Sequence, residues 1–244
     1  MRVCVALNTM ASFLFNCFSV HYNCRKLPFR AILFCRLPRR VLLLPHKQAI
    51  DFMKKILVIL GHPSASSFNH ALAQHYVKSA SEAGHDVQLL ELGKLTFDPI
   101  LREGYQQRQE LEPDLQAAWQ QILWAEHLVL VFPTWWGVAP ALLKGFFDRL
   151  FLPGMAFKYR PNSQFWDKLL SGRSARIITT MDSPKIYNWL VYRNANIRSV
   201  RQATLEYCGI KPVSVTVFDR LRFADEKRRV KMLEKVGKMG RMGK

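Results

Sequence analysis

The sequence predicts an α/β protein with one doubly wound, five-stranded parallel sheet and helices on both of its faces. Continuous apolar runs of strand length recur through residues 53–244, and such runs are typical of strands buried on both faces. Stretches of helical composition separate these runs, as the crossover connections of a parallel sheet require. Proline and glycine lie where several of these helices are expected to begin or end.

The first strand, helix and second strand follow one another directly. The run "KILVIL" at 55–60 is apolar throughout and is followed by Gly61, which indicates a fully buried strand. A helix is expected over 68–83, because Gly84 then closes it as a C-terminal cap. The second strand follows as "HDVQLLEL" at 85–92.

The centre of the chain adds a helix, a strand and a further helix. The helix near 113–125 begins with Pro113, since proline is favoured in the first turn. The run "HLVLVF" at 127–132 is a second fully buried strand, which Pro133 stops. Pro140 then begins the next helix.

Two strands and two helices are expected in the remainder. The strands are "SARIITT" at 174–180 and "KPVSVTVF" at 211–218. A long helical stretch between them ends at Cys208–Gly209. The final helix, 225–239, opens on acids and ends on lysines, as the helix dipole prefers.

The first 52 of the 244 residues differ from the rest of the chain. This segment is apolar and basic, has no steady period, and contains Asp51 as its only acid. Polar interruptions argue against a transmembrane helix, and the segment lacks the layout of a secretory signal. We expect residues 1–52 to be a disordered extension or a mis-assigned start, with Met53 opening one domain over 53–244.

Charge and cysteine usage bound the partners and the compartment. The formal net charge of +18 suggests affinity for anions such as nucleotide phosphates. We expect no nucleic-acid partner, because no nucleic-acid motif accompanies the charge. Cys208 is the only cysteine within 53–244, which fits a reducing compartment and predicts a cytoplasmic protein. No metal site is expected, because the N-terminal cysteine spacings match no compact metal pattern; the alternative is a Cys-His-Cys site of Cys17, His21 and Cys24.

Ligands of parallel sheets bind beyond the carboxyl ends of the strands. The loops expected there are 61–68, 93–112, 133–138 and 181–187. The first, in "GHPSASSFNHAL", lacks a G-x-G-x-x-G fingerprint but places His62, Ser66 and Ser67 where the chain enters a helix. Helix amides and hydroxyl donors suit a phosphate there. Equally, Ser66 or Ser67 is merely an N-cap, and composition leaves both alternatives open.

The loop "PTWWGVAP" sets two tryptophans side by side. Gly137 allows a close backbone approach, so the turn can follow the edge of a planar ring that stacks on Trp135 or Trp136. The alternative is a hydrophobic plug against the neighbouring helix or a dimer partner. In "TTMDSPKIY", Thr179 and Thr180 end a strand with hydroxyl groups that face the same crevice or make ordinary strand-end hydrogen bonds.

Three segments resemble a known family: "GHPSASSFNHAL", "VFPTWWGVAPALLKGFFDRLF" and "RIITTMDSP". The chain is similar over about residues 54–240 to the flavodoxin-like NAD(P)H:quinone oxidoreductases, the DT-diaphorase group. Bacterial relatives in this family include the modulator-of-drug-activity proteins and the ancillary flavoproteins of potassium-efflux systems. The middle segment is the most specific of the three, and the match leaves residues 1–52 uncovered.

The resemblance implies a flavin held non-covalently at the strand ends, FAD or FMN, with NAD(P)H as the electron donor. The match "HPSASSFN" favours FAD. The phosphate side of the flavin would be held by His62, Ser66, Ser67, Phe68 and Asn69. The isoalloxazine ring would lie along Pro133, Thr134, Trp135, Trp136 and Gly137. The other ring-binding loop would begin with Thr179 and Thr180.

Two further residues match positions that the family uses. Asp148 falls where relatives carry an acid beside the cofactor, and Tyr187 falls at an active-site tyrosine. Tyr187 and Trp136 are therefore the expected catalytic residues. Met181 and Asp182 replace the paired glycines of the quinone reductases, and Trp135 stands where many relatives have glutamine, so the roles of these three side chains are left open.

The family implies two-electron, ping-pong hydride transfer from NAD(P)H through the flavin to a quinone or similar flat acceptor. It also implies a homodimer with the site at the interface. The alternative function is a regulatory flavoprotein that docks on a membrane potassium-efflux transporter. No hydrolytic motif is present in the sequence, which agrees with chemistry that needs no nucleophile.

Overall fold

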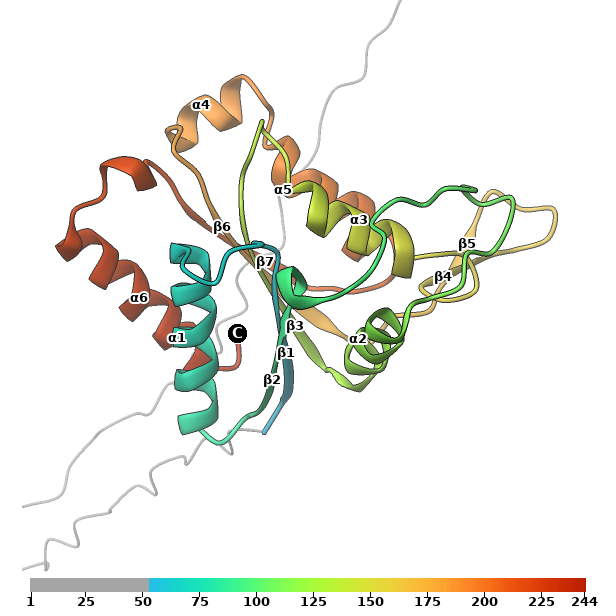
Figure 1. Cartoon of the computed structure of the whole chain (residues 1–244), viewed down its shortest axis with the longest axis horizontal. Coiled ribbons are helices and arrows are strands. Elements are labelled where there is room, and N and C mark those ends of the chain that lie inside the picture. Colours follow the sequence, from blue (N-terminus) through green and yellow to red (C-terminus); the bar gives the residue numbers. More distant parts are fainter. Residues whose placement is uncertain (1–52) are drawn as a thin grey trace, which may run out of the picture. The chain divides into compact units, whose positions relative to one another are not determined.

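The computed structural model describes residues 53–244, and the expectation for residues 1–52 lies outside this range. The described chain is built on a parallel sheet of five strands in the order β2-β1-β3-β6-β7 (Figure 1). These strands are β1 (Lys55–Leu60), β2 (Asp86–Glu91), β3 (His127–Pro133), β6 (Ser174–Thr180) and β7 (Val213–Phe218). The prediction of a doubly wound α/β fold is therefore confirmed, and each expected strand is present.

Helices cover both faces of the sheet, because side chains on a strand point alternately to opposite faces. On β1, Ile56 and Val58 pack with α1 (Phe68–Glu82) and α6 (Glu226–Arg241). Leu57 and Ile59 pack on the other face (Figure 1). That face is covered by α2 (Pro113–Trp124), α3 (Ala141–Leu150), α5 (Ala195–Val200) and a π-helical turn, η2 (Arg201–Glu206).

Glycine allows α6 to approach α1 closely. A Cβ added at Gly240 would lie 2.6 Å from the carbonyl oxygen of Tyr76 on α1, so a larger residue would push the helices apart. The two helices form one hydrophobic cluster with the sheet, which includes Val236 of α6 and Leu72 of α1. This cluster fixes the N-terminal end of α1 against the strand ends.

Two parts of the fold differ from the sequence prediction. A small antiparallel hairpin, β4 (Phe157–Tyr159) and β5 (Trp166–Lys168), was not expected. The long helical stretch expected before Cys208 is broken into α4 (Lys185–Leu190), α5 and the π turn. The break lies at Arg193 and Asn194, whose φ angles of 51° and 55° are incompatible with a continuous right-handed helix.

Short 3₁₀ turns follow two of the strands, η1 (Leu92–Lys94) after β2 and η3 (Leu221–Phe223) after β7. The second of these turns reaches the same edge of the sheet as the expected ligand loops. Among residues 53–244, none of the helices is both long and apolar enough to cross a bilayer.

The amino ends of the strands bury ionisable side chains. His127 at the start of β3 is 4% exposed, and its Nδ1 lies 2.8 Å from Ser174 Oγ. Arg176 on β6 donates from Nη1 to Thr216 Oγ1 at 3.0 Å. Burial, and to a smaller extent the positive charges of Lys54 and Arg176, together lower the pKa of His127 to about 4. His127 is therefore neutral in the folded protein at pH 7.

Candidate active site

Three loops at the carboxyl ends of the strands meet around one cavity of about 190 Å³, which we name the strand-end cavity. They follow β1, β3 and β6, and the turn after β7 closes one side. The cavity is lined by His62, Ser67, Phe68, Asn69, Pro133, Thr134, Trp135, Thr180, Met181, Asp182 and Leu221. Most of the residues expected to hold a flavin are thus brought together, although the chain separates the first from the last by more than a hundred positions.

The first loop supplies both an N-cap for α1 and free amides suited to an anion, the two alternatives that composition left open. Ser67 is the N-cap of α1, because its Oγ accepts a hydrogen bond from the amide of His70 at 3.2 Å. Ser66 lies outside the cavity lining, with its hydroxyl 2.9 Å from that of Ser64. The amides of Phe68 and Asn69 in the first turn have no intrahelical acceptor, and that turn contains no acid. The end of α1 therefore remains suited to an anion.

His62 is held as a neutral ring beside the cavity. Its Nδ1 accepts a hydrogen bond from the amide of Ser64 at 3.0 Å, which leaves Nε2 as the protonated nitrogen. Burial lowers the pKa of His62 below its usual 6.5. The ring meets Trp135 edge to face, with the ring centroids 5.4 Å apart. His62 can thus donate one hydrogen bond without adding charge.

The tryptophan pair forms the start of a tight two-residue turn. The backbones of Trp135 and Val138 exchange two hydrogen bonds of 3.0 Å. The central residues Trp136 and Gly137 both have positive φ, 51° and 75°, as in a type I′ turn. Glycine adopts this conformation freely, whereas a tryptophan there is strained by about 1–2 kcal/mol.

The turn points its two tryptophans in different directions. Trp136 is 99% exposed and Trp135 is 44% exposed, and only Trp135 lines the strand-end cavity. Within the described chain, the interpretation of Trp136 as a plug against a neighbouring helix is therefore wrong. Trp136 is held out in solvent at the rim of the site.

A buried network of neutral side chains forms the floor of the site. Asn69 and Thr180 are fully or nearly buried, and the Asn69 amide bonds the Thr180 hydroxyl at 3.0 Å. The hydroxyls of Thr134 and Thr179 lie 3.0 Å apart. The two threonines that end β6 thus make strand-end hydrogen bonds, and Thr180 also faces the cavity.

The network continues into residues that the sequence did not single out. Asn196 on α5 donates to Thr134 Oγ1 at 2.7 Å, and Asn188 on α4 donates to Asn196 Oδ1 at 3.2 Å. Both asparagines are buried, at 0% and 2% exposure. The sequence gives no signal that these asparagines are buried among the apolar residues of this stretch, and their burial depends on the break between α4 and α5.

The structure defines roles for two positions that the resemblance left open. Met181 is buried, and its carbonyl accepts from the amide of Leu221 at 3.1 Å. The Asp182 carboxylate accepts from the amide of Arg222 at 2.9 Å. Both residues therefore tie the loop after β6 to the turn after β7.

Tyr187 lies on α4 beside the site but does not line the strand-end cavity. It is 45% exposed, and its ring meets that of Tyr192 edge to face at 5.6 Å. Tyr192 in turn packs on the tryptophan turn, since a Cβ added at Gly137 would lie 3.4 Å from the Tyr192 ring. This aromatic pair couples α4 to the turn.

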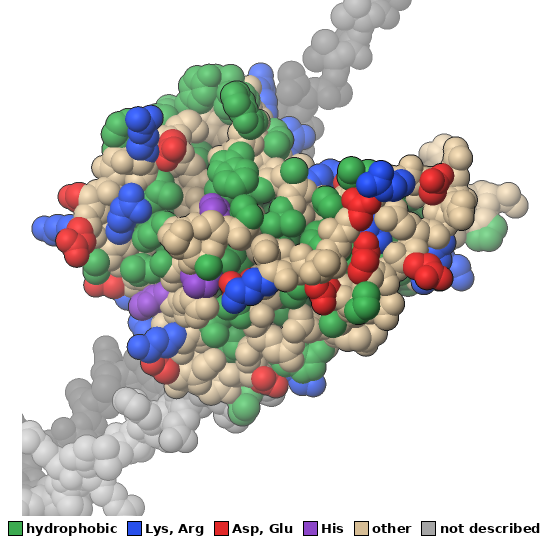
Figure 2. All heavy atoms as spheres, in the orientation of Figure 1, with side chains coloured by type: hydrophobic (Ala, Val, Ile, Leu, Met, Phe, Trp, Pro, Cys, Tyr) green, Lys and Arg blue, Asp and Glu red, His purple; other side chains and the backbone are tan. Residues whose placement is uncertain are grey.

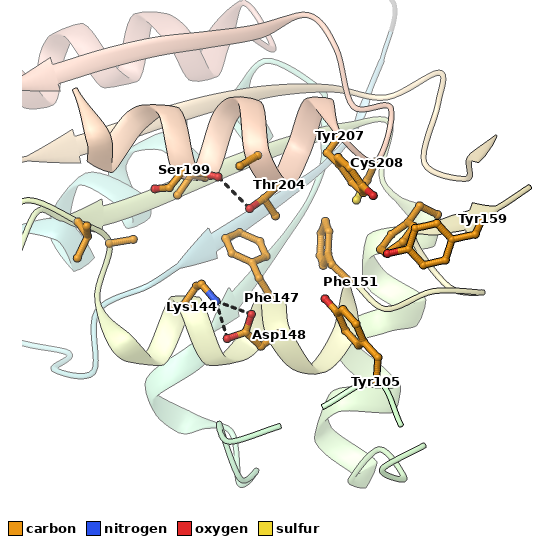
Figure 3. Close-up of a pocket in the computed structure, with 15 residues that line it drawn as sticks. Tyr105, Lys144, Phe147, Asp148, Phe151, Tyr159, Ser199, Thr204, Tyr207 and Cys208 are labelled. Atoms are coloured by element: carbon orange, nitrogen blue, oxygen red, sulfur yellow. Dashed lines mark hydrogen bonds and ion pairs between the residues drawn. The ribbon is translucent and has the colours of Figure 1, made fainter. Parts of the chain in front are cut away.

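Asp148 is not brought to the strand-end cavity. It lies on α3, where both of its oxygens accept from Lys144 Nζ at 2.6 and 2.7 Å. It lines a second, larger hollow of about 460 Å³ between α3, η2 and the β4–β5 hairpin, which we name the aromatic cavity (Figure 3). Rings of Phe147, Phe151 and Tyr207 point into this cavity. A place for Asp148 beside the cofactor stays a prediction.

The expected second loop, 93–112, is also held away from the strand-end cavity. Arg149 of α3 is fully buried and donates to the backbone carbonyls of Asp98 and Glu110 and to both carboxylate oxygens of Glu112. Burial alone would raise the pKa of Glu112, but the hydrogen bonds from Arg149 outweigh it and the pKa is lowered. This clamp fixes the loop on α3, where Tyr105 lines the aromatic cavity.

The fold and site together define an α/β protein with a polar cavity at the switch in strand order, where β1 and β3 are neighbours. Residues 54–239 match the family described as having a flavodoxin-like fold. The chain is 30% identical over 182 residues to an uncharacterized NAD(P)H oxidoreductase of Haemophilus influenzae, covering 73% of this chain and 90% of that protein. The chain therefore belongs to the family of flavodoxin-like NAD(P)H oxidoreductases and quinone reductases, and it is an oxidoreductase.

The solved structures similar to this one include two oxidoreductases. The NAD(P)H:quinone oxidoreductase of Methanothermobacter marburgensis has 25% sequence identity and a TM-score of 0.65, covering 78% of this chain and 98% of that chain. An FMN-dependent NADH-azoreductase of Bacillus anthracis, solved in complex with FMN, has 18% identity and a TM-score of 0.63, covering 77% of this chain and 98% of that chain. The second likeness shows the fold alone.

Proposed function

We propose that the chain is a flavin-dependent NAD(P)H:quinone oxidoreductase. The observation that carries this proposal is the meeting of the first loop, the tryptophan turn and Thr180 at the end of β6 around one cavity. The relatives support it, since they include an NAD(P)H:quinone oxidoreductase. When bound, flavin would supply the redox chemistry, a two-electron, ping-pong transfer from NAD(P)H to an acceptor.

The residues around the strand-end cavity fit a flavin in the chemistry of their donors. The free amides of Phe68 and Asn69, with His62 Nε2 nearby, suit a phosphate group at the start of α1. The turn from Pro133 to Gly137 offers backbone groups beside an aromatic wall. We assign FAD, with FMN as the alternative, on the first-loop match.

The other residues orient the reactants. Trp136 offers an exposed aromatic face at the rim, suited to stacking a flat ring. The Tyr187 hydroxyl would donate a hydrogen bond to the acceptor as it is reduced. The buried threonine and asparagine network holds the loops in place without a charged group. Together these residues bind and orient, and none has to act as a nucleophile.

A homodimer is part of the same proposal, as is a quinone or similar flat acceptor. The aromatic cavity offers a surface for the second subunit, because it is open, rich in phenylalanine and tyrosine, and adjoins the tryptophan turn through Val138 and Ala139. Analytical ultracentrifugation tests this expectation. A cytoplasmic location, expected from the single cysteine of the body, is proposed with it.

The purified protein tests the proposal directly. We expect a yellow protein with flavin absorbance that oxidises NADH or NADPH when a quinone is added. Release of the flavin by denaturation, followed by chromatography, distinguishes FAD from FMN. A protein that stays colourless after incubation with both flavins would overturn the proposal.

A further inference from the structure

Helix α4 buries a polar side chain and exposes its apolar ones. Its buried residue is the polar Asn188, which is 2% exposed and bonded to Asn194 and Asn196. Its apolar residues face solvent, with Ile186 65%, Trp189 58% and Leu190 56% exposed. A helix of a globular protein ordinarily buries its apolar side chains and exposes its polar ones.

The exposed apolar side chains form one projecting surface, which we name the α4 tip. It comprises Ile186, Trp189, Leu190 and the following Val191, which is 53% exposed. Figure 1 shows α4 projecting beyond the carboxyl ends of the strands, and Figure 2 shows hydrophobic side chains gathered at this place. A contiguous exposed apolar surface of this kind marks an interaction site.

The α4 tip lies in a basic stretch of the chain. Residues 183–205 contain no aspartate or glutamate. Lys185, Arg193 and Arg198 are exposed in the same stretch. The nearest acids lie at the base of α4 and not on the tip: Asp182 accepts from the backbone amide of Arg222, and Asp219 accepts from the backbone amide of Lys185 and pairs with the Arg228 guanidinium.

This charge pattern selects among possible occupants. A second copy of the tip would bring the same positive charge, and like charges that face each other across an interface oppose association. An anionic bilayer is complementary both to the apolar side chains of the tip and to the basic charges around it. Tryptophan and aliphatic side chains enter the boundary between headgroups and acyl chains, while lysine and arginine bind the anionic headgroups.

We propose that the α4 tip docks on the surface of an anionic phospholipid bilayer. The tip adjoins the candidate active site, because Tyr192 lies between it and Gly137 of the tryptophan turn. If the proposed function holds, docking brings the site to quinones that are dissolved in the bilayer, which are its substrate class. The docking itself needs no turnover.

Vesicle sedimentation with the full chain tests the docking. The protein should pellet with vesicles that contain phosphatidylglycerol and much less with vesicles of phosphatidylcholine alone. Combining Trp189→Ser with Leu190→Ser should weaken the affinity at least about tenfold, because both side chains lose their apolar contact with lipid. Arg193→Gln alone should weaken it about fivefold, and added salt should act in the same direction.

Matched control variants separate the tip from general stickiness. Phe165→Ser removes an aromatic side chain that is 71% exposed in the β4–β5 hairpin. Lys238→Gln removes an exposed lysine of α6. Both controls should bind vesicles as the wild type does. If the vesicle affinity of the controls falls as far as that of the tip variants, or if lipid composition does not change the affinity, the docking proposal is wrong.

A second measurement separates this proposal from the proposed function. The tip variants should slow reduction of a long-chain quinone held in vesicles while leaving reduction of a water-soluble quinone unchanged. Vesicle binding without any quinone reduction would leave the docking standing and overturn the function. Quinone reduction without vesicle binding would do the reverse. A dimer that dissociates when Trp189 is replaced, or a transporter subunit that occupies the tip and excludes lipid, would also overturn the docking.

Discussion

The two ends of the central sheet bury different kinds of polar group. At the carboxyl ends, Asn69, Thr180 and Asn196 are neutral and bond to one another or to further hydroxyls. At the amino ends, His127 and Arg176 are ionisable, and His127 Nε2 and Arg176 Nε lack a partner within the described chain. The floor of the candidate active site thus consists of neutral groups whose hydrogen bonds do not change with pH. Among these buried groups, those at the amino ends should therefore make the largest contribution to the pH dependence of stability.

The largest effect expected is the loss of stability on acidification through His127. The pKa of His127 falls from 6.5 to about 4 on folding, so between these values the unfolded chain binds a proton that the folded chain does not. The free energy of unfolding should therefore fall by about 3 kcal/mol as pH drops from 6.5 to 4, with no contribution from His127 above this window. Urea denaturation across the window measures it.

The variant His127→Gln should remove that part of the pH dependence and leave the rest. Wild type and variant are compared at each pH, so carboxylates that titrate nearby cancel. If the two curves stay parallel down to pH 4, the amino end does not set the pH response and the comparison fails.

The next effect is the loss of one hydroxyl at the carboxyl end. Thr180→Val leaves the buried Asn69 amide without its partner, which should lower the free energy of unfolding by about 2 kcal/mol. It should also weaken flavin binding, because Thr180 lines the strand-end cavity. Equilibrium titration with FMN and FAD measures the second effect.

The matched variant Thr216→Val sharpens this contrast. Thr216 is equally a buried strand threonine, but it bonds Arg176 on the amino side of the sheet. The Thr216→Val variant should have a lower free energy of unfolding but the same flavin affinity as the wild type. Equal losses of flavin affinity in both variants would mean that the effect is general and not that of the site.

A smaller effect of opposite sign is expected at the tryptophan turn. Trp136→Gly relieves the positive φ of 51° and should raise the free energy of unfolding by about 1 kcal/mol. The same variant should weaken flavin binding or slow acceptor turnover, since the exposed ring is lost. Trp136→Ala is the control, because it removes the ring but keeps the strain. Unchanged activity in both variants would return Trp136 to a surface residue without a role.

The smallest effect on stability is expected at Asp148. Its ion pair with Lys144 is exposed and spaced i, i+4, so Asp148→Asn should change the free energy of unfolding by less than about 0.5 kcal/mol. The variant therefore tests the cofactor role of Asp148 cleanly. A clear loss of flavin affinity would place it beside the cofactor, and an unchanged affinity would remove it from the site.

The sequence predicted most of the fold because the physical signals were local. The apolar runs of β1 and β3 are buried on both faces, and Pro113 and Gly84 lie at the helix ends where they were expected. The β4–β5 hairpin was missed because its strands have three residues each, too few to show a period. The break before α5 depends on left-handed backbone at Arg193, a residue that gives no such signal.

The sequence predicted many of the residues of the candidate site but not the hydrogen-bond network that connects them. The resemblance and the strand-end rule together found Ser67, Asn69 and Thr180, which the structure brings to one cavity. Neither could show that Asn188 and Asn196 complete the network, because that depends on how two short helices pack. The larger cavity, between α3 and η2, contains Asp148 but none of the other residues expected to hold a flavin, so volume alone would have indicated a different candidate site.

Trp136 has a consequence for how the chain would respond to artificial selection. In a library selected for survival of heating alone, glycine or asparagine should accumulate at this position, because the turn becomes easier to form. In a library selected for turnover, tryptophan should persist despite its strain. A different residue at position 136 after the two selections would therefore indicate that stability and turnover place opposite requirements on the turn.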